Sequence, residues 1–340
     1  MQEDKVFYFL QPTSDQAIAM TRILNTTNSC KLIAVLLKNE KKSGAIKKLY
    51  SSSIRVESYS DINNGIIVPF GAASTEMLLK NQDIKLSNVT MKQSSLSVYS
   101  KDLFIEFCNS NNLPVPKTFL TEDQISSEDY PLFYKQKYEK GGGVRGIAYA
   151  KTELPKEGKS DLIYQEFIDT PGTYGVGFIA RDGVLEVCFS HFESLSYPVS
   201  GGSAIKVEAY KSERLVELTA KYIEASHYSG WGLAEFKWCD KRQDFVFMEI
   251  NAKLWASCEF SFRNEPAFIQ KLFGIETIKE EIPSMIFIHR AFNAGLISGL
   301  KHSFRSSGAQ KNIYPGLFRM IVIGTIPNPV KNNLKKILSR

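Results

Sequence analysis

FVFMEINAK, the segment from Phe245 to Lys253, carries an acid, an amide and a base at steps of two residues. On an extended strand the side chains alternate between the two faces, so Glu249, Asn251 and Lys253 lie on the same side. Two oxygen ligands and a cation at the end of a strand suit Mg²⁺ and a phosphate chain. The segment therefore predicts a strand that ends in a polar site.

A second acidic run precedes this segment. GLAEFKW, from Gly232 to Trp238, also has the pattern of a strand and carries Glu235. The polar residues 240–244 between the two runs are typical of a turn, which predicts an antiparallel hairpin. In such a hairpin Glu235 and Glu249 can face one ion.

A glycine-rich loop, Gly141 to Gly146 (GGGVRG), lies upstream between two strand-like runs. A dinucleotide-binding loop opens a helix, a Walker A loop ends in Gly-Lys-Ser/Thr, and a kinase needs His-Arg-Asp and Asp-Phe-Gly; none of these fits. A loop between two strands is instead a flap whose bare backbone can approach phosphates, although a flexible hairpin tip is the alternative. Together with the two acidic runs, this flap predicts binding of ATP and Mg²⁺.

The strand that enters the glycine loop ends in two lysines, Lys135 and Lys137, on one face. A lysine at this position can act as a point charge on phosphate oxygens. Both residues are candidates, and we favour Lys135.

The composition excludes several classes of protein. The 340 residues are 43% hydrophobic and 23% charged with a formal net charge of +6, which is typical of a globular protein of two or three domains and too weakly basic to indicate nucleic-acid binding. Five scattered cysteines without a CxxC pair argue against a disulfide framework or a zinc site. No apolar run is long enough for a membrane span, and the charged N-terminus is not a signal peptide, so we expect a cytoplasmic protein.

The first 90 residues alternate between predicted strands and helices. The strands are expected at 6–10, 31–37 and 66–69, and the segment Thr13-Ser14-Asp15 is expected to cap a helix that ends near Leu24. This alternation predicts a small parallel sheet, and the lack of glycine after the first strand disfavours an NAD-dependent oxidoreductase. Further helices are expected at 103–109 and 213–226, strands over 131–190, a mostly helical chain beyond 260 and a solvated basic tail at 331–340.

In this order the motifs resemble the ATP-grasp superfamily, and within it the carboxylate–amine ligases. The resemblance covers residues 95–260 well and 1–95 in general layout. It implies a fold of mixed α/β and α+β class with three lobes and ATP held between the last two. The lobes are a Rossmann-like lobe at 1–95, a central lobe with the glycine flap at 96–170, and a C-terminal lobe with the metal site and a helical tail at 171–340.

The resemblance also implies roles for individual residues. Lys101 and Lys135 would hold the nucleotide phosphates under the backbone of the flap, and the hinge would contact adenine mostly through its backbone. Glu235, Glu249 and Asn251 would bind one or two Mg²⁺ ions, with Mn²⁺ as a substitute. The implied flap residues are Gly141, Gly142 and Gly143, and the implied hinge residues are Gln165, Glu166, Phe167 and Ile168.

The activity implied is phosphoryl transfer from ATP to a carboxylate, followed by attack of an amine on the acyl phosphate. Lys253 would neutralise the phosphate or acyl phosphate, and His191 with the Gly201–Gly202 turn would shape the substrate site; an ordinary strand histidine is the alternative. Amino acids, peptides or sugar acids are the suggested substrates, and relatives often pair as homodimers. A ligase that uses a thiol or bicarbonate, or a non-catalytic nucleotide-binding regulator, are the competing hypotheses.

Three departures from the family pattern bear on this hypothesis. Lysine stands at 253 where arginine is usual, which removes the bidentate fork. Residues 171–174 (PGTY), which come shortly after the hinge, offer no acid to hold the ribose, and Trp255 and Cys258 replace the small residues that are common near the substrate.

Overall fold

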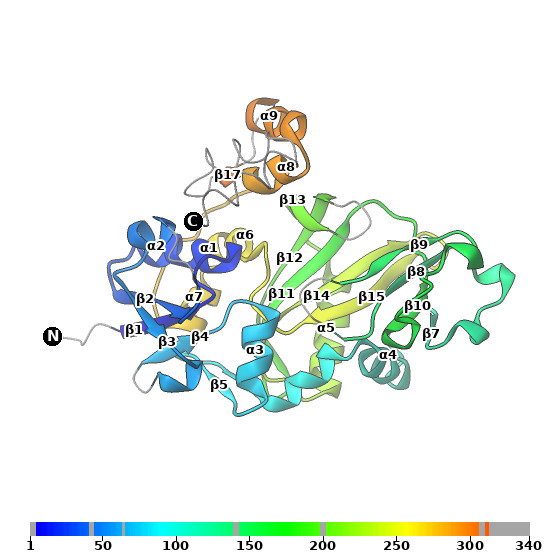
Figure 1. Cartoon of the computed structure of the whole chain (residues 1–340), viewed down its shortest axis with the longest axis horizontal. Coiled ribbons are helices and arrows are strands. Elements are labelled where there is room, and N and C mark those ends of the chain that lie inside the picture. Colours follow the sequence, from blue (N-terminus) through cyan, green and yellow to red (C-terminus); the bar gives the residue numbers. More distant parts are fainter. Residues whose placement is uncertain are drawn as a thin grey trace.

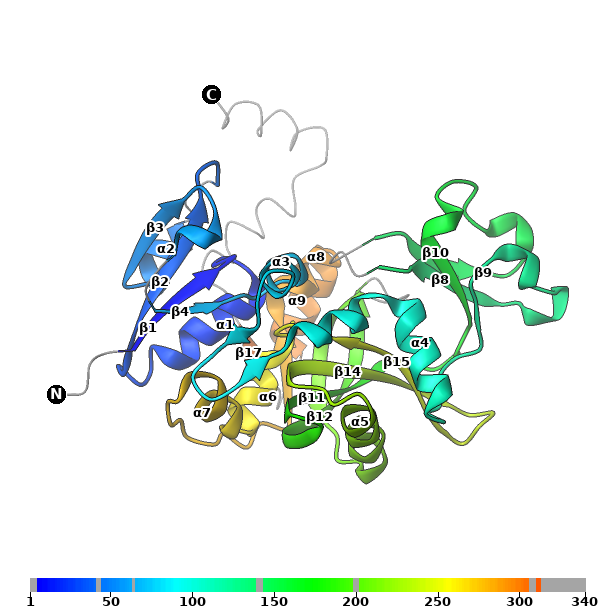
Figure 2. The same ribbon diagram turned by 90° about the horizontal axis from the view of Figure 1, so that it is seen from below.

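The computed structural model describes residues 5–40, 44–62, 65–138, 143–197, 202–305 and 310–312. These residues form three larger sheets and one two-stranded sheet. Figure 1 and Figure 2 show the N-terminal sheet at one end of an elongated molecule and the sheet with β8, β9 and β10 at the other. The glycines Gly141 and Gly142, the Gly201 of the expected turn and the tail at 331–340 lie outside the described residues.

The N-terminal sheet is parallel throughout, as the alternation of strands and helices predicted. Its strand order is β3-β2-β1-β4. The strand β3 was missed by the sequence prediction, because its residues, SSIRV, contain few apolar side chains. The strands are β1 (Lys5–Leu10), β2 (Cys30–Leu37), β3 (Ser52–Val56) and β4 (Ile66–Val68), and the helices are α1 (Asp15–Leu24), α2 (Gly44–Leu49) and α3 (Ala72–Leu79).

Helix α1 begins where its sequence predicted. The side chain of Ser14 accepts a hydrogen bond from the backbone N–H of Ala17 at 3.3 Å, which satisfies one of the donors that a helix start leaves without a partner. This cap fixes the turn from β1 into α1, and Gln11 and Gln16 on either side of it both line the cavity described below.

The second sheet contains the strands on both sides of the glycine loop. Its strand order is β7-β10-β8-β9, with antiparallel pairing, and it has a core of its own around Leu132 and Tyr164. The predicted unit of strand, glycine loop and strand is confirmed as β8 and β9. The strands are β7 (Thr118–Phe119), β8 (Leu132–Gln136), β9 (Arg145–Ala148) and β10 (Leu162–Glu166).

The third sheet has the order β15-β14-β11-β12-β13-β16-β17. The predicted hairpin of the two acidic runs is confirmed as the antiparallel pair β14 and β15 at one edge of this sheet. The strands are β11 (Thr173–Arg181), β12 (Val184–Tyr197), β13 (Ser203–Ala209), β14 (Gly230–Cys239), β15 (Asp244–Asn251), β16 (Ser284–Phe287) and β17 (Gln310–Asn312).

Two helices pack on the third sheet through aromatic side chains. The ring of Phe104 in α4 (Lys101–Ser110) lies 5.3 Å from that of Tyr222 in α5 (Glu213–Ala225) and 5.2 Å from that of Phe247 in β15. Helix α4 therefore shares its core with the third sheet, although the sequence suggested that it belongs to a central lobe at 96–170. The proposed lobe boundaries stay a prediction.

The N-terminal sheet and the third sheet share one continuous hydrophobic core. Phe7 of β1 contacts Phe273 edge-on at 5.3 Å between ring centroids, and the Lys5 ammonium donates to the carbonyl of Gly274 at 2.8 Å. These contacts come from α7 (Ala267–Phe273) and the glycine that follows it. The other helices beyond residue 255 are α6 (Cys258–Asn264), α8 (Ile288–Asn293) and α9 (Leu296–Arg305).

The remaining elements are short. The two-stranded sheet joins β5 (Ile84–Lys85) and β6 (Thr90–Met91). The 3₁₀ turns are Tyr59–Asp61, Gln93–Tyr99, Glu122–Gln124, Ser127–Asp129, Lys151–Glu153 and Lys159–Asp161. Within the described ranges, no helix combines the length and the apolar character that crossing a membrane requires.

Candidate active site

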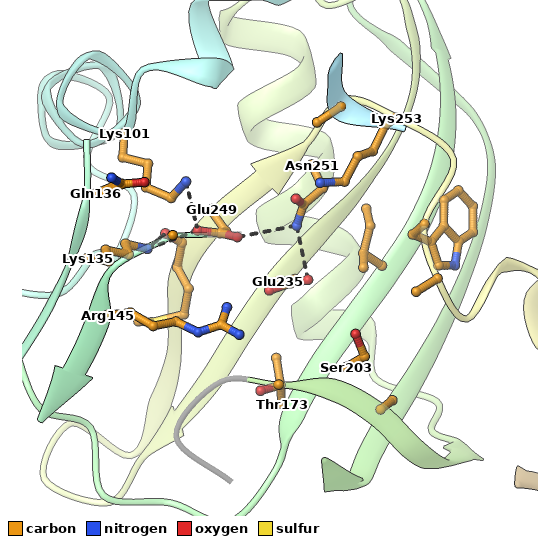
Figure 3. A pocket seen from close by; sticks show the side chains of 18 of the residues that line it. Lys101, Lys135, Gln136, Arg145, Thr173, Ser203, Glu235, Glu249, Asn251 and Lys253 are labelled. Carbon is orange, nitrogen blue, oxygen red and sulfur yellow. Dashed lines mark hydrogen bonds and ion pairs between the residues drawn. The ribbon is translucent and has the colours of Figure 1, made fainter. Parts of the chain in front are cut away.

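The hairpin of β14 and β15 brings two acids and an amide together. Glu235 and Glu249 are directly opposite each other in the strand register, and Met248 is the extra residue of a bulge beside them. The Asn251 amide donates to Glu235 Oε1 at 3.0 Å and to Glu249 Oε1 at 3.4 Å (Figure 3). The three residues that the sequence predicted as metal ligands therefore converge on one spot.

Two buried lysines approach the same spot from other elements. Lys135 of β8 places its ammonium 3.0 Å from Glu249 Oε2, and Lys101 at the start of α4 places its ammonium 3.8 Å from the same oxygen. A backbone hydrogen bond of 2.8 Å from Lys101 N–H to the Lys137 carbonyl joins the two elements. Lys135 lines the cavity and Lys137 does not, which agrees with the preference for Lys135.

The two acids have opposite pKa shifts. Burial, together with the charges of Glu249 and Glu193, raises the pKa of Glu235 above its usual range. Burial alone would also raise the pKa of Glu249, but the nearby Lys135 and Lys101 hold it well below its usual range. The geometry thus leaves the charge of Glu249 neutralised by lysines and the charge of Glu235 poorly compensated.

The donor set fits a hard divalent cation. Two carboxylates and one amide offer the oxygen atoms that Mg²⁺ prefers, and a cation between Glu235 and Glu249 would relieve the repulsion that raises the pKa of Glu235. No group of three or more His, Cys, Asp or Glu side chains suited to a metal occurs in the described residues. An ion held here would therefore keep positions for water or phosphate oxygens, as Mg²⁺ does in phosphoryl-transfer sites.

These residues line a cavity of about 560 Å³, whose wall includes residues of the N-terminal region, the second sheet and the third sheet. Many of the other residues that line the cavity are small, or neutral and polar. Those residues are Gln11, Gln16, Gly71, Ala72, Ala73, Ser203, Ala204, Ala256 and Ser257.

The two residues predicted to be catalytic occupy different positions. Lys253 lines the cavity, and its backbone N–H donates to the Asn251 carbonyl at 2.9 Å. His191 is completely buried and does not line the cavity; its Nε2 lies 3.3 Å from Ser257 Oγ and 3.6 Å from Glu193 Oε1. His191 therefore contacts two residues of the cavity wall from behind, and the expectation that it shapes the substrate site directly needs this correction.

Among the predicted nucleotide contacts, the hinge segment lies apart from the cavity. None of residues 165–168 lines it. The backbone N–H groups of Glu166 and Phe167 donate to the carbonyls of Lys117 at 2.9 Å and Pro131 at 3.2 Å. The adenine role of this segment stays a prediction, whereas Gly143, the one flap glycine of the prediction that is described, lines the cavity.

Glu193, Ser257 and Arg145 are among the cavity residues that sequence reasoning missed. Glu193 could have been found, because it follows His191 by two residues on β12 and therefore shares its face. Arg145 stands inside the quoted glycine motif, but its direction depends on the pairing of β9 with β8. Ser257 lies in a loop, where no periodicity indicates direction.

Comparison of the sequence with protein-family models and with curated proteins finds no match. Solved structures with a similar fold include biotin carboxylase from Campylobacter jejuni in complex with β,γ-ATP, with 17% identity, a TM-score of 0.60, and coverage of 81% of this chain and 72% of that one. L-amino acid ligase from Bacillus licheniformis has 13% identity and a TM-score of 0.54, with 77% and 70% covered.

Pyruvate carboxylase from Rhizobium etli has 15% identity and a TM-score of 0.59. The likeness covers 78% of this chain but only 28% of that longer chain. At these identities the likeness shows the fold, which is the ATP-grasp fold that the motifs predicted.

Proposed function

We propose that this chain, which has the ATP-grasp fold, is an ATP-dependent ligase that activates a carboxylate as an acyl phosphate and joins it to an amine, releasing ADP and phosphate. The observation that carries the proposal is the convergence of Glu235, Glu249 and Asn251 with two buried lysines in the wall of a 560 Å³ cavity.

The charged residues would divide the work of phosphoryl transfer. Glu235, Glu249 and Asn251 would hold Mg²⁺, which when bound neutralises charge on the phosphate oxygens. Lys101 and Lys135, which neutralise Glu249, would bind phosphate oxygens, and Lys253, two residues beyond the end of β15, would approach the same group. Positioning and charge balance are the main tasks of the protein in such a reaction.

Glu193 supports an amine as the second substrate. Its carboxylate lines the cavity outside the Glu235–Glu249 pair and accepts a hydrogen bond from Ser257 Oγ at 3.4 Å. A carboxylate attracts an ammonium group and repels bicarbonate or a thiolate. His191, which contacts both Ser257 and Glu193, would hold these two side chains in place rather than touch the substrate.

The proposal is tested by measuring ADP release from ATP with Mg²⁺ in the presence of pooled carboxylic acids and pooled amines. We expect ADP release that requires both pools. Formation of AMP would contradict the acyl-phosphate route, because that route cleaves only the terminal phosphate.

Three further arms of the same assay address the competing functions. Turnover that needs bicarbonate or a thiol in place of the amine would identify the other ligase class. Stabilisation of the protein by ATP without turnover in any arm would favour a nucleotide-binding regulator.

A further inference from the structure

Arg145 and Lys135 form a cross-strand pair of like charges on the wall of the cavity. The antiparallel register of β8 and β9 puts Arg145 directly opposite Lys135, so both side chains lie on the same face of the sheet. Both residues line the cavity, and Figure 3 shows the Arg145 guanidinium pointing into the space in front of Glu235 and Glu249. Like charges at opposite positions destabilise a sheet unless an anion lies between them.

The protein supplies such an anion to Lys135 but not to Arg145. Glu249 contacts Lys135 and is shared with Lys101, whereas Arg145 forms no ion pair with any carboxylate of the described residues. Among the described residues that line the cavity, five are lysine or arginine and three are glutamate. The Arg145 charge is therefore available to an anionic ligand.

The strand register also places Arg145 along the length of a nucleotide. On β8, Leu132 lies opposite Glu166 of the segment predicted to contact adenine, and Lys135 lies opposite Arg145. Three residues of strand correspond to about 10 Å. Arg145 is thus displaced from the adenine end toward the metal site, where the terminal phosphates would lie.

We propose that Arg145 binds the terminal phosphate of ATP through its planar guanidinium, from the side of the cavity opposite the Glu235–Glu249 pair. This inference rests on the proposed function and adds a residue that distinguishes ATP from ADP. A guanidinium matches two oxygens of one phosphate with parallel hydrogen bonds, which the point charge of a lysine such as Lys253 cannot do.

The experiment measures binding of β,γ-methylene ATP and of ADP, each with Mg²⁺, by isothermal titration calorimetry. It compares the unmodified protein with Arg145→Gln, Arg145→Lys and Lys137→Gln. The last variant is the matched control, because it removes a positive charge beside the glycine loop, just after β8, from a residue that does not line the cavity.

Loss of a charge-assisted contact should weaken binding of the ATP analogue to Arg145→Gln by about 10- to 100-fold. ADP binding should stay within about twofold, Arg145→Lys should be intermediate, and Lys137→Gln should bind both nucleotides normally. Arg145 is exposed at the cavity wall, and Arg145→Lys keeps its charge, so a folding defect in one variant does not remove the comparison.

Two results would overturn the inference, and they are distinguishable. If the unmodified protein binds the analogue and Arg145→Gln binds it equally well, or loses ADP affinity to the same extent, Arg145 does not read the terminal phosphate while the proposed function stands. If the unmodified protein binds neither nucleotide, the proposed function fails and this inference fails with it.

Discussion

Two buried ionic clusters in this protein differ in how completely the protein itself satisfies them. The first is the cavity cluster of Lys101, Lys135, Glu235 and Glu249. Its two lysines both contact the Glu249 carboxylate, and the Glu235 carboxylate lies opposite Glu249 in the strand register. In the second, Arg290 donates to Asp15 Oδ2 at 2.9 Å and to the carbonyls of Ala204 at 2.7 Å and Ala256 at 2.8 Å.

The second cluster also includes His289, whose Nε2 lies 2.8 Å from Asp15 Oδ2. We call Asp15, His289 and Arg290 the Arg290 cluster. This cluster joins the start of α1 to α8 and to two residues of the cavity wall. Asp15 and Arg290 are 275 residues apart along the chain. A cluster whose donors meet protein acceptors contributes to stability, whereas one with excess charge is suited to a ligand.

This contrast predicts the largest effect on catalysis in the cavity cluster. Glu249→Ala and Lys135→Ala should each reduce ATP-dependent turnover at least about a hundredfold, because each removes a main electrostatic contact of the reacting phosphate. The measurement is the ADP-release rate at saturating ATP and Mg²⁺. Glu57→Ala and Lys38→Ala, which break an exposed ion pair, serve as matched controls; turnover that survives the cavity substitutions would refute the assignment.

The largest effect on stability should come from the Arg290 cluster. Arg290→Met should lower the free energy of unfolding by about 3 kcal/mol, because it leaves Asp15 and two buried carbonyls without their donor. Urea unfolding measures this loss. Arg214→Met, which breaks a more exposed ion pair with Asp244, should cost less than about 1 kcal/mol, and equal losses in the two variants would erase the contrast.

The same cluster should make stability depend on pH. Burial, together with the charge of Arg290, lowers the pKa of His289 although Asp15 acts in the opposite direction. A histidine whose pKa is lower in the folded state takes up a proton on unfolding, so stability should fall as the pH drops below about 6.5. Burial alone would raise the pKa of Asp15, but the hydrogen bond from His289 and the charge of Arg290 lower it, which extends the loss of stability below about pH 4.

Urea unfolding at pH 7.5, 6.0 and 5.0 tests this pH dependence. The variant His289→Gln should show a flatter profile between pH 7.5 and 5.0, and His227→Gln, at an exposed position, should keep the original slope. A His289→Gln profile as steep as that of the unmodified protein would assign the dependence to other groups.

The smallest expected effect sharpens the comparison further. Glu235→Gln should raise the stability of the ligand-free protein by about 1 kcal/mol, because burial and the facing Glu249 make a charge at this position unfavourable. The same variant should lose the thermal stabilisation that Mg²⁺ and β,γ-methylene ATP give the unmodified protein. Destabilisation of the ligand-free variant would show that Glu235 belongs to a satisfied network after all.

The parts of the fold that sequence predicted well are those set by neighbouring residues. The helix start at Thr13-Ser14-Asp15, the acidic hairpin of β14 and β15, and the strands on both sides of the glycine loop were predicted from local patterns and are confirmed, with Ser14 as the capping residue. The roles of Glu235, Glu249 and Asn251 in metal binding stay a prediction, although their convergence is observed.

Other features could not be predicted, because they depend on how distant elements pack. The sequence pattern around a histidine in an alternating strand is the same whether the side chain faces a cavity or packs behind the cavity wall. His191 packs behind the wall. Strand β3 has too few apolar residues to show the alternation of apolar and polar side chains that indicates a strand.

The sequence by itself determined which side chains share a strand face, because side chains alternate between the two faces of any extended backbone. It therefore placed Glu249, Asn251 and Lys253 together and made Glu235 their partner through a short turn. Only the tertiary structure decided that Lys101 and Lys135 share Glu249, that Arg145 faces Lys135, and that Arg290 reaches Asp15. The contacts at Glu249 and at Asp15 follow from the packing of elements far apart along the chain, whereas Arg145 faces Lys135 because of the register of β8 and β9. No local sequence pattern specifies either.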